Sequence, residues 1–111
     1  MAITSELLGK IGGADVEVIP VSASWRSSDP YILYVGEVPP GKTHWVFVIG
    51  TMEAASTKSN YPDLWIGDTS SRFDGDGGVA AEVRAGYHVT MKSRFGLRDD
   101  VFTGHIYIVK G

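Results

Sequence analysis

The sequence predicts an all-β fold, an antiparallel β-sandwich that is jelly-roll-like and carries a short N-terminal helix. The 111 residues include 14 glycines, and these separate short runs that are rich in β-branched and aromatic residues. About seven such runs follow one another after the N-terminal segment, which is typical of two packed sheets. The length predicts one domain with one core.

The first element is expected to be a helix over Thr4–Lys10, ended by Gly12 and Gly13. Its apolar residues recur at helical spacing, and they are Ile3, Leu7, Leu8 and Ile11. A helix this short is not stable alone, so the stripe is expected to dock on its own sandwich or on another subunit. We therefore expect residues 1–13 to form an N-terminal helical segment and residues 14–111 to form a single β-sandwich domain.

The other elements are expected to be strands. In chain order they are Val16–Val21, Tyr31–Val35, Thr43–Ile49, Leu64–Ile66, Val79–Val83, Tyr87–Phe95 and Gly104–Lys110. The mostly apolar Tyr31–Val35 is typical of a central strand. Polar loops are expected at Ser22–Pro30, Glu53–Pro62 and Asp68–Gly78.

Two of these strands alternate clearly between apolar and polar residues. In Tyr87–Phe95, the side chains of Tyr87, Val89, Met91, Ser93 and Phe95 share one face, and those of His88, Thr90, Lys92 and Arg94 share the other. In the last strand, His105, Tyr107 and Val109 oppose Ile106 and Ile108. Such alternation predicts which face of each sheet meets the core.

The stretch Gly36–Thr43 matches the phosphate-binding pattern G-x-x-x-x-G-K-[ST]. A phosphate loop must open a helix, whereas His44–Ile49 is β-branched and aromatic and predicts a strand. Pro39 and Pro40 also lack the N–H donors that phosphate requires. The sequence therefore favours a tight turn between two strands, with proline and glycine at its corner.

Metal sites are weakly indicated. Asp74-Gly75-Asp76-Gly77-Gly78 departs from the calcium loop of helix–loop–helix proteins, although a non-standard calcium site with Asp68, Asp74 and Asp76 is an alternative. The histidines His44, His88 and His105 lie in different expected strands, and their spacing does not make them converge. We expect no metal and no cofactor.

Composition and motifs argue against several function classes. The chain has no cysteine and no G-x-S-x-G, and no pair of acids stands out for glycoside hydrolysis, so we expect no enzyme activity. The formal net charge of −3 argues against a nucleic-acid partner. No apolar run is long enough to span a membrane, and the N-terminus lacks the pattern of a secretory signal.

Aromatic residues near polar loops are candidates for binding. Trp25 lies within SASWRSSDP, with Tyr31 and Tyr61 as further candidates. An exposed aromatic ring can stack on a sugar or anchor a neighbouring subunit. The alternative is that the tryptophans and tyrosines fill the core, as large aromatic residues usually do.

The layout resembles small β-sandwich virion proteins of tailed bacteriophages. Those proteins often have a strand, a turn resembling V-P-A-G-K-T and then another strand, as in Tyr31–Val35, Val38–Thr43 and His44–Ile49 here. In those proteins alanine is more common at the position that the second proline of Val-Pro-Pro-Gly-Lys occupies here. Those proteins also often end with a glycine turn, a long alternating strand and a final apolar strand, as in Arg84-Ala85-Gly86, Tyr87–Phe95 and Gly104–Lys110 here. The opening MAITSELLGKIGG resembles the start of minor tail proteins of actinobacterial phages.

The resemblance implies a non-enzymatic virion structural protein, assembled in the cytoplasm of the bacterial host. A minor tail component is the first expectation, and a head decoration protein is an alternative. The expected partners are further copies of the chain, such as a trimer, and other virion proteins, with Ile3, Leu7, Leu8 and Ile11 at the assembly interface. A second alternative is a carbohydrate-binding module that contacts host glycans through Trp25, Tyr31 and Tyr61.

Overall fold

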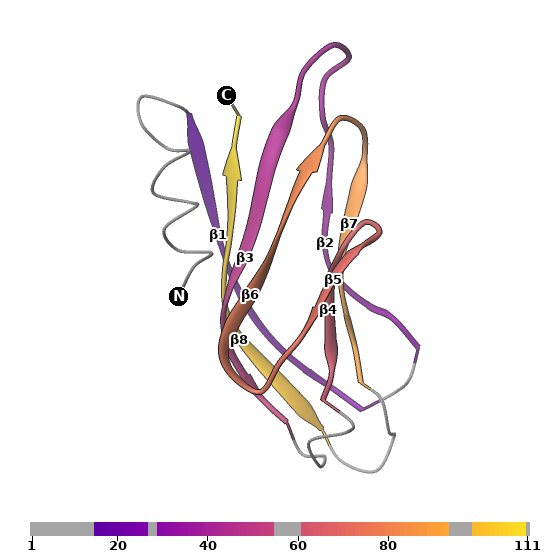
Figure 1. Cartoon of the computed structure of the whole chain (residues 1–111), viewed down its shortest axis with the longest axis vertical. Coiled ribbons are helices and arrows are strands. Elements are labelled where there is room, and N and C mark those ends of the chain that lie inside the picture. The colour runs from indigo at the N-terminus through magenta and orange to yellow at the C-terminus, as the bar shows by residue number, and fades with distance from the viewer. Residues whose placement is uncertain (1–14, 27–28, 55–60, 94–98, 111) are drawn as a thin grey trace.

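The computed structural model describes residues 15–26, 29–54, 61–93 and 99–110 (Figure 1). The expected helix Thr4–Lys10 and its apolar stripe lie outside these residues. The described chain forms eight strands and no helix. They are β1 (Val16–Trp25), β2 (Tyr31–Gly36), β3 (His44–Glu53), β4 (Asp63–Ile66), β5 (Thr69–Arg72), β6 (Gly75–Val83), β7 (Tyr87–Lys92) and β8 (Asp100–Val109).

The strands form two four-stranded antiparallel sheets. Sheet A has the order β1-β8-β3-β6, and sheet B has the order β2-β7-β4-β5. The pairing is nested: β1 pairs with β8, β2 with β7, β3 with β6, and β4 with β5. Every connection except the β4–β5 hairpin carries the chain from one sheet to the other. The predicted all-β class with antiparallel sheets is thus confirmed.

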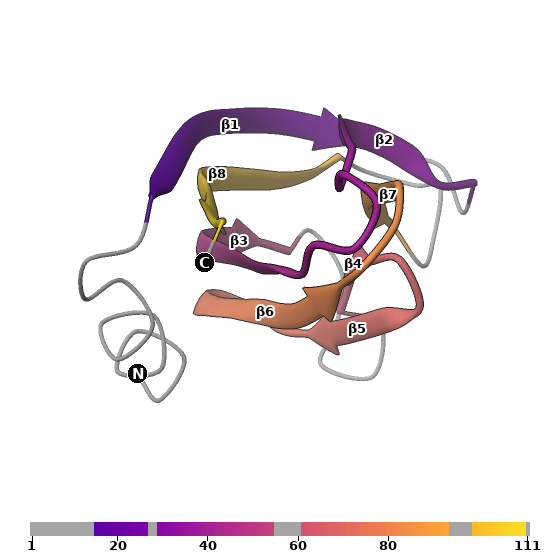
Figure 2. The same ribbon diagram turned by 90° about the horizontal axis from the view of Figure 1, so that it is seen from above.

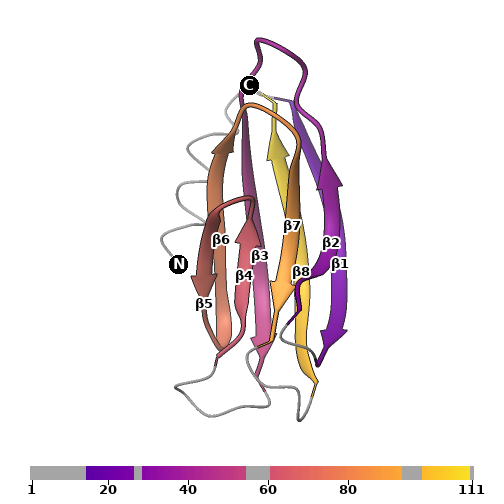
Figure 3. The ribbon, with the colours of Figure 1, turned by 90° about the vertical axis from the view of Figure 1, so that its right-hand side faces the viewer.

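The two sheets lie face to face, as the end-on view shows (Figure 2). Their strands run along the same long axis (Figure 3). Val46 and Val48 of β3 have no exposed surface and belong to one apolar core with Leu64 of β4 and Val89 of β7. Because strand side chains alternate, the inward residues of both sheets form this core, and burial of each aliphatic side chain contributes about 2 kcal/mol.

A row of glycines crosses sheet A on its inner side. Gly77 of β6 pairs with Gly50 of β3, which pairs with Gly104 of β8. A Cβ at Gly77 would overlap the ring of Phe73, and one at Gly50 would press on Phe102 and on the backbone of β8. The two phenylalanine rings pack edge to face with centroids 6.2 Å apart. The missing side chains therefore make room for this aromatic pair.

The turn between β2 and β3 has the form that the sequence predicts. The Lys42 amide donates to the Pro39 carbonyl at 3.0 Å, and Gly41 has a φ of 78°. Proline followed by a glycine with positive φ is the signature of a type II turn. Strand β3, not a helix, follows it. This turn therefore does not open the helix N-terminus that a phosphate loop requires.

Several expected boundaries were wrong. Strand β1 continues through Ser22–Trp25, which we expected to be loop, and β3 continues to Glu53. Strand β5 lies wholly within the expected loop Asp68–Gly78, and β6 begins in it at Gly75. Strand β8 begins at Asp100, earlier than predicted. Strand β2 is at the edge of sheet B rather than in its centre, and its apolar residues are divided between the core side and an exposed outer side.

Candidate interaction surfaces

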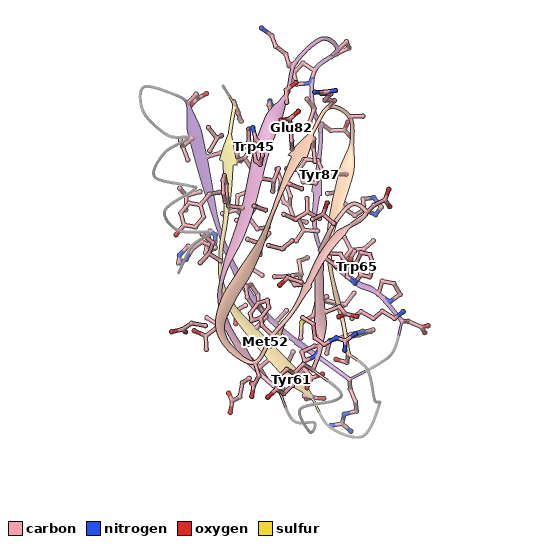
Figure 4. The ribbon with its side chains drawn as sticks, in the orientation of Figure 1. Trp45, Met52, Tyr61, Trp65, Glu82 and Tyr87 are labelled. Carbon is pink, nitrogen blue, oxygen red and sulfur yellow. The ribbon has the colours of Figure 1, made fainter. Side chains whose placement is uncertain are left out.

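The outer face of sheet B is built from three rows of side chains. Register pairs place Val35 beside His88, and Ile32 beside Thr90 and then Trp65. The next row brings together Lys92, Asp63 and Arg72. Leu64 and Ile66 are buried, so alternation turns Trp65 outward (Figure 4). This face therefore combines an apolar row with a charged row.

A bulge in β2 enlarges the apolar part of that face. The register shifts between Ile32 and Tyr34, and the extra residue lets Ile32 and Val35 both point outward. Their exposed fractions are 49% and 54%, which are high for aliphatic residues in strands. Tyr34 instead packs against the core. Edge strands with exposed apolar side chains are ready surfaces for contact.

A shallow groove runs over this face. Its lining includes Ile32, Val35, Trp65, His88, Thr90 and Lys92, together with the acidic residues Glu37 and Asp68. Asp63, beside it, is paired with Arg72 at 3.3 Å. The groove thus offers a half-buried indole, two aliphatic side chains and hydrogen-bonding groups of both signs. Such a surface suits a ligand or partner of mixed polarity that carries little net charge.

The outer face of sheet A carries a second apolar surface, which we call the outer cluster. It consists of the buried residues Phe47 and Val109 with the half-buried residues Val16, Trp45, Ile49, Ala80 and Tyr107. The rings of Trp45 and Phe47 stack with centroids 6.1 Å apart. Alternation along β3 explains the placement, because Val46 and Val48 point to the opposite side, into the main core. The prediction that Tyr107 and Val109 oppose Ile106 and Ile108 is confirmed.

The structure brings Trp25 and Tyr31 together. Their rings stack with centroids 4.7 Å apart, and the Trp25 indole Nε1–H donates to the Asp29 carbonyl at 2.6 Å. The Trp25 carbonyl accepts a hydrogen bond from the Ser93 hydroxyl at 2.7 Å. These contacts join the last residue of β1 to the first residue of β2, to Asp29 and to Ser93. They give Trp25 a structural role, while its expected role in binding stays a prediction.

Tyr61, the third aromatic candidate, is half-buried just before β4 (Figure 4). Sequence reasoning did not single out Trp65 over Trp25. The signal that distinguishes them was present, because Leu64 and Ile66 predict that the residue between them faces outward. The candidate assembly residues Ile3, Leu7, Leu8 and Ile11 lie outside the described residues.

The three histidines occupy three different surroundings. His44 is buried at the start of β3, His88 is exposed on the outer face of sheet B, and His105 is exposed on that of sheet A. Asp74 accepts a hydrogen bond from the Ala54 amide, and Asp76 accepts one from Thr51. Among the described residues, no group of three or more His, Asp or Glu side chains is placed to hold a metal ion.

His44 Nδ1 and the Tyr87 hydroxyl are buried and have no hydrogen-bond partner within the described part of the chain. Tyr87 is buried between the sheets (Figure 4). Burial raises the pKa of Tyr87 far above its ordinary value, and negative charge at Tyr34 and Glu17 raises it further. The phenol therefore stays neutral while the protein is folded.

Comparison of the chain with protein-family models, with curated proteins and with solved structures finds no match. Within residues 15–26, 29–54, 61–93 and 99–110 there is no helix with the length and hydropathy that crossing a bilayer takes.

Proposed function

We propose that the chain is a non-enzymatic structural protein of a tailed-bacteriophage virion. A minor tail component is the first proposal, and a head decoration protein is the alternative. The observation that carries the proposal is that apolar side chains are exposed on the outer face of sheet B. Ile32 and Val35 lie there, with exposed fractions of 49% and 54%. A two-layer sandwich needs apolar residues only between its sheets, so outward ones favour contacts with further protein.

The strand order adds support. Nested pairing of β1 with β8 through β4 with β5 is the arrangement of a jelly roll, which recurs in viral capsid proteins. Fold alone does not determine function, so the argument rests on the surfaces and on the resemblance of the sequence. We propose that sheet B contacts other copies of the chain, giving a closed ring such as a trimer.

The test is the mass in solution by light scattering over a wide range of concentrations. We expect an oligomer of fixed size, and we expect the double variant Ile32→Ser/Val35→Ser to shift it toward monomer. The matched control is Arg84→Ala, because this exposed side chain lies outside the groove. A monomer at every concentration for the unaltered chain would contradict self-assembly through sheet B.

The groove around Trp65 favours a second candidate function, the binding of a host or polysaccharide glycan. Sugar rings stack their apolar faces on aromatic rings and use their hydroxyls to donate and accept hydrogen bonds. Trp65 is the stacking candidate, with Thr90, His88 and Lys92 as polar neighbours. A glycan array followed by Trp65→Ala tests this. Loss of a glycan signal with the fold intact supports it, and an array without response contradicts it.

A further inference from the structure

The starting observation is the burial of Phe47 on the outer face of sheet A. The structure contains one chain, and yet Phe47 has no exposed surface and Val109 has 3%. Both point away from sheet B, since the main core is formed by their strand neighbours Val48 and Ile108. The outer face of a two-layer sandwich ordinarily meets solvent. The burial of Phe47 on this face therefore needs an explanation.

The cross-strand neighbours of Phe47 flank its ring. Phe47 lies between Ala80 of β6 and Tyr107 of β8. Strand side chains stand roughly perpendicular to the sheet, so these neighbours shield the flanks of the ring and not its outer side. Alanine is also too short to shield a phenylalanine ring. Ala80 and Tyr107 alone therefore do not account for the burial of Phe47.

The segment that can cover Phe47 is the one that precedes β1. At one end of sheet A, Trp25 pairs with Asp100 and Glu53 pairs with Val101. The outer cluster reaches the opposite end, where Val16 pairs with Val109. There the Lys110 amide donates to the Asp15 carbonyl at 2.8 Å. The described chain thus begins beside the outer cluster.

We infer that residues 2–13 dock in cis on the outer cluster of their own chain, with Ile3, Leu7, Leu8 and Ile11 against Phe47 and Trp45. Phe47 lies two strands in from β1, a distance of about 10 Å. A helix over residues 4–10 is about 10 Å long, so the segment reaches this point. Docking also gives the short helix the packing that it needs for stability. The inference does not depend on the virion role.

The direct test is NMR of the full chain at low concentration. We expect nuclear Overhauser contacts between the methyl groups of Leu7 or Leu8 and the ring protons of Phe47. A second sample mixes isotope-labelled with unlabelled chains, so that filtered spectra report contacts between chains only. The same contacts in the filtered spectrum would overturn docking in cis and assign it to a neighbouring copy.

Variants give an independent measurement. Leu7→Ser/Leu8→Ser removes two apolar side chains from the stripe, and we expect the folding equilibrium constant in urea to fall at least tenfold. The matched control is Glu6→Gln/Lys10→Gln, which alters polar residues of the same segment and should leave the constant within about twofold. Equal constants for the leucine variant and the unaltered chain would overturn the inference.

Deletion of residues 2–13 distinguishes docking in cis from docking on a neighbouring copy of the chain. Docking in cis predicts that the shortened chain binds a hydrophobic dye strongly and self-associates, because the outer cluster is uncovered. Docking in trans predicts that the shortened chain becomes monomeric with unchanged stability. The leucine variant and the NMR contacts keep the test decisive if the shortened chain fails to fold.

Discussion

Gly36 faces Tyr87 across the β2–β7 ladder, and the Tyr87 ring occupies the position that a Cβ of residue 36 would take. Gly36 has an ordinary backbone conformation and is itself buried. Glycine is therefore required here by packing and not by its φ angle. The ring of Tyr34 lies beside that of Tyr87, with centroids 6.3 Å apart. An edge strand of sheet B is thus fixed to its neighbour by an aromatic ring over a glycine.

Replacing Gly36 by alanine should destabilise the fold. The added methyl would overlap the Tyr87 ring, which is buried and has little room to move, so we expect a loss of about 2 kcal/mol in the free energy of unfolding. Urea unfolding followed by circular dichroism measures it. Gly86→Ala is the control, because its nearest neighbour at 3.4 Å is the mobile end of the Glu37 side chain. Equal effects of both substitutions would contradict the packing role.

Tyr87→Phe should raise the free energy of unfolding by about 1 kcal/mol, because it removes a buried hydroxyl without a partner within the described residues. Urea unfolding at neutral pH measures this change. A loss of stability in the variant would mean that the hydroxyl has a partner that stabilises the fold.

Alkaline pH provides a further test of Tyr87. Its pKa is raised on folding, so the unfolded chain loses this proton at a lower pH than the folded chain. Stability is therefore fully present below the ordinary value near 10 and falls as the pH rises above it. We expect this fall to be smaller in Tyr87→Phe. Identical pH profiles for the two proteins would contradict the raised pKa.

Trp25→Ala should reduce stability by about 2 kcal/mol, since it removes the stacking on Tyr31 and the hydrogen bond to Asp29. Trp25→Phe keeps an aromatic ring, so its loss of stability should be about half that of Trp25→Ala. Chemical unfolding of both variants provides the comparison. If instead Trp25→Ala left stability unchanged and abolished a glycan signal, the binding role expected from sequence would be restored.

Lys42→Ala should change neither the free energy of unfolding nor the thermal shift that added nucleotide produces. Lys42 closes a type II turn and is exposed, so its side chain contributes little to the fold. Strand β3 follows the turn, which removes the helix N-terminus that would hold phosphate. A thermal-shift titration with Mg-ATP and Mg-GTP should show no shift for either protein. A shift that disappears in the variant would contradict the turn assignment.

Much of the fold could be predicted because burial imposes a period of two. Tyr87, Val89 and Met91 are buried while His88 is exposed, as the alternation predicts. The polar strands were missed because their composition is that of loops. Strand β5 is Thr-Ser-Ser-Arg at a sheet edge, although Gly67-Asp68 after Ile66 is a recognised signal for a two-residue hairpin.

The candidate surfaces were harder to predict than the strands. The bulge in β2 turns both Ile32 and Val35 outward, and strict alternation from Tyr31 would have separated them. The outer cluster could not be predicted either, because Trp45, Phe47 and Ile49 alternate with equally apolar neighbours in a run that is hydrophobic on both sides. Such a run indicates a strand covered on both faces without saying what covers it.

The nested pairing has a consequence for how the protein is made. The innermost hairpin, β4 with β5, closes a two-residue loop, while β1 must wait for β8, whose last residue is Val109. During synthesis from the N-terminus, half of the strands leave the ribosome before their partners exist. Closing such long loops makes folding slow and leaves β1 unpaired on the nascent chain until β8 has been synthesised.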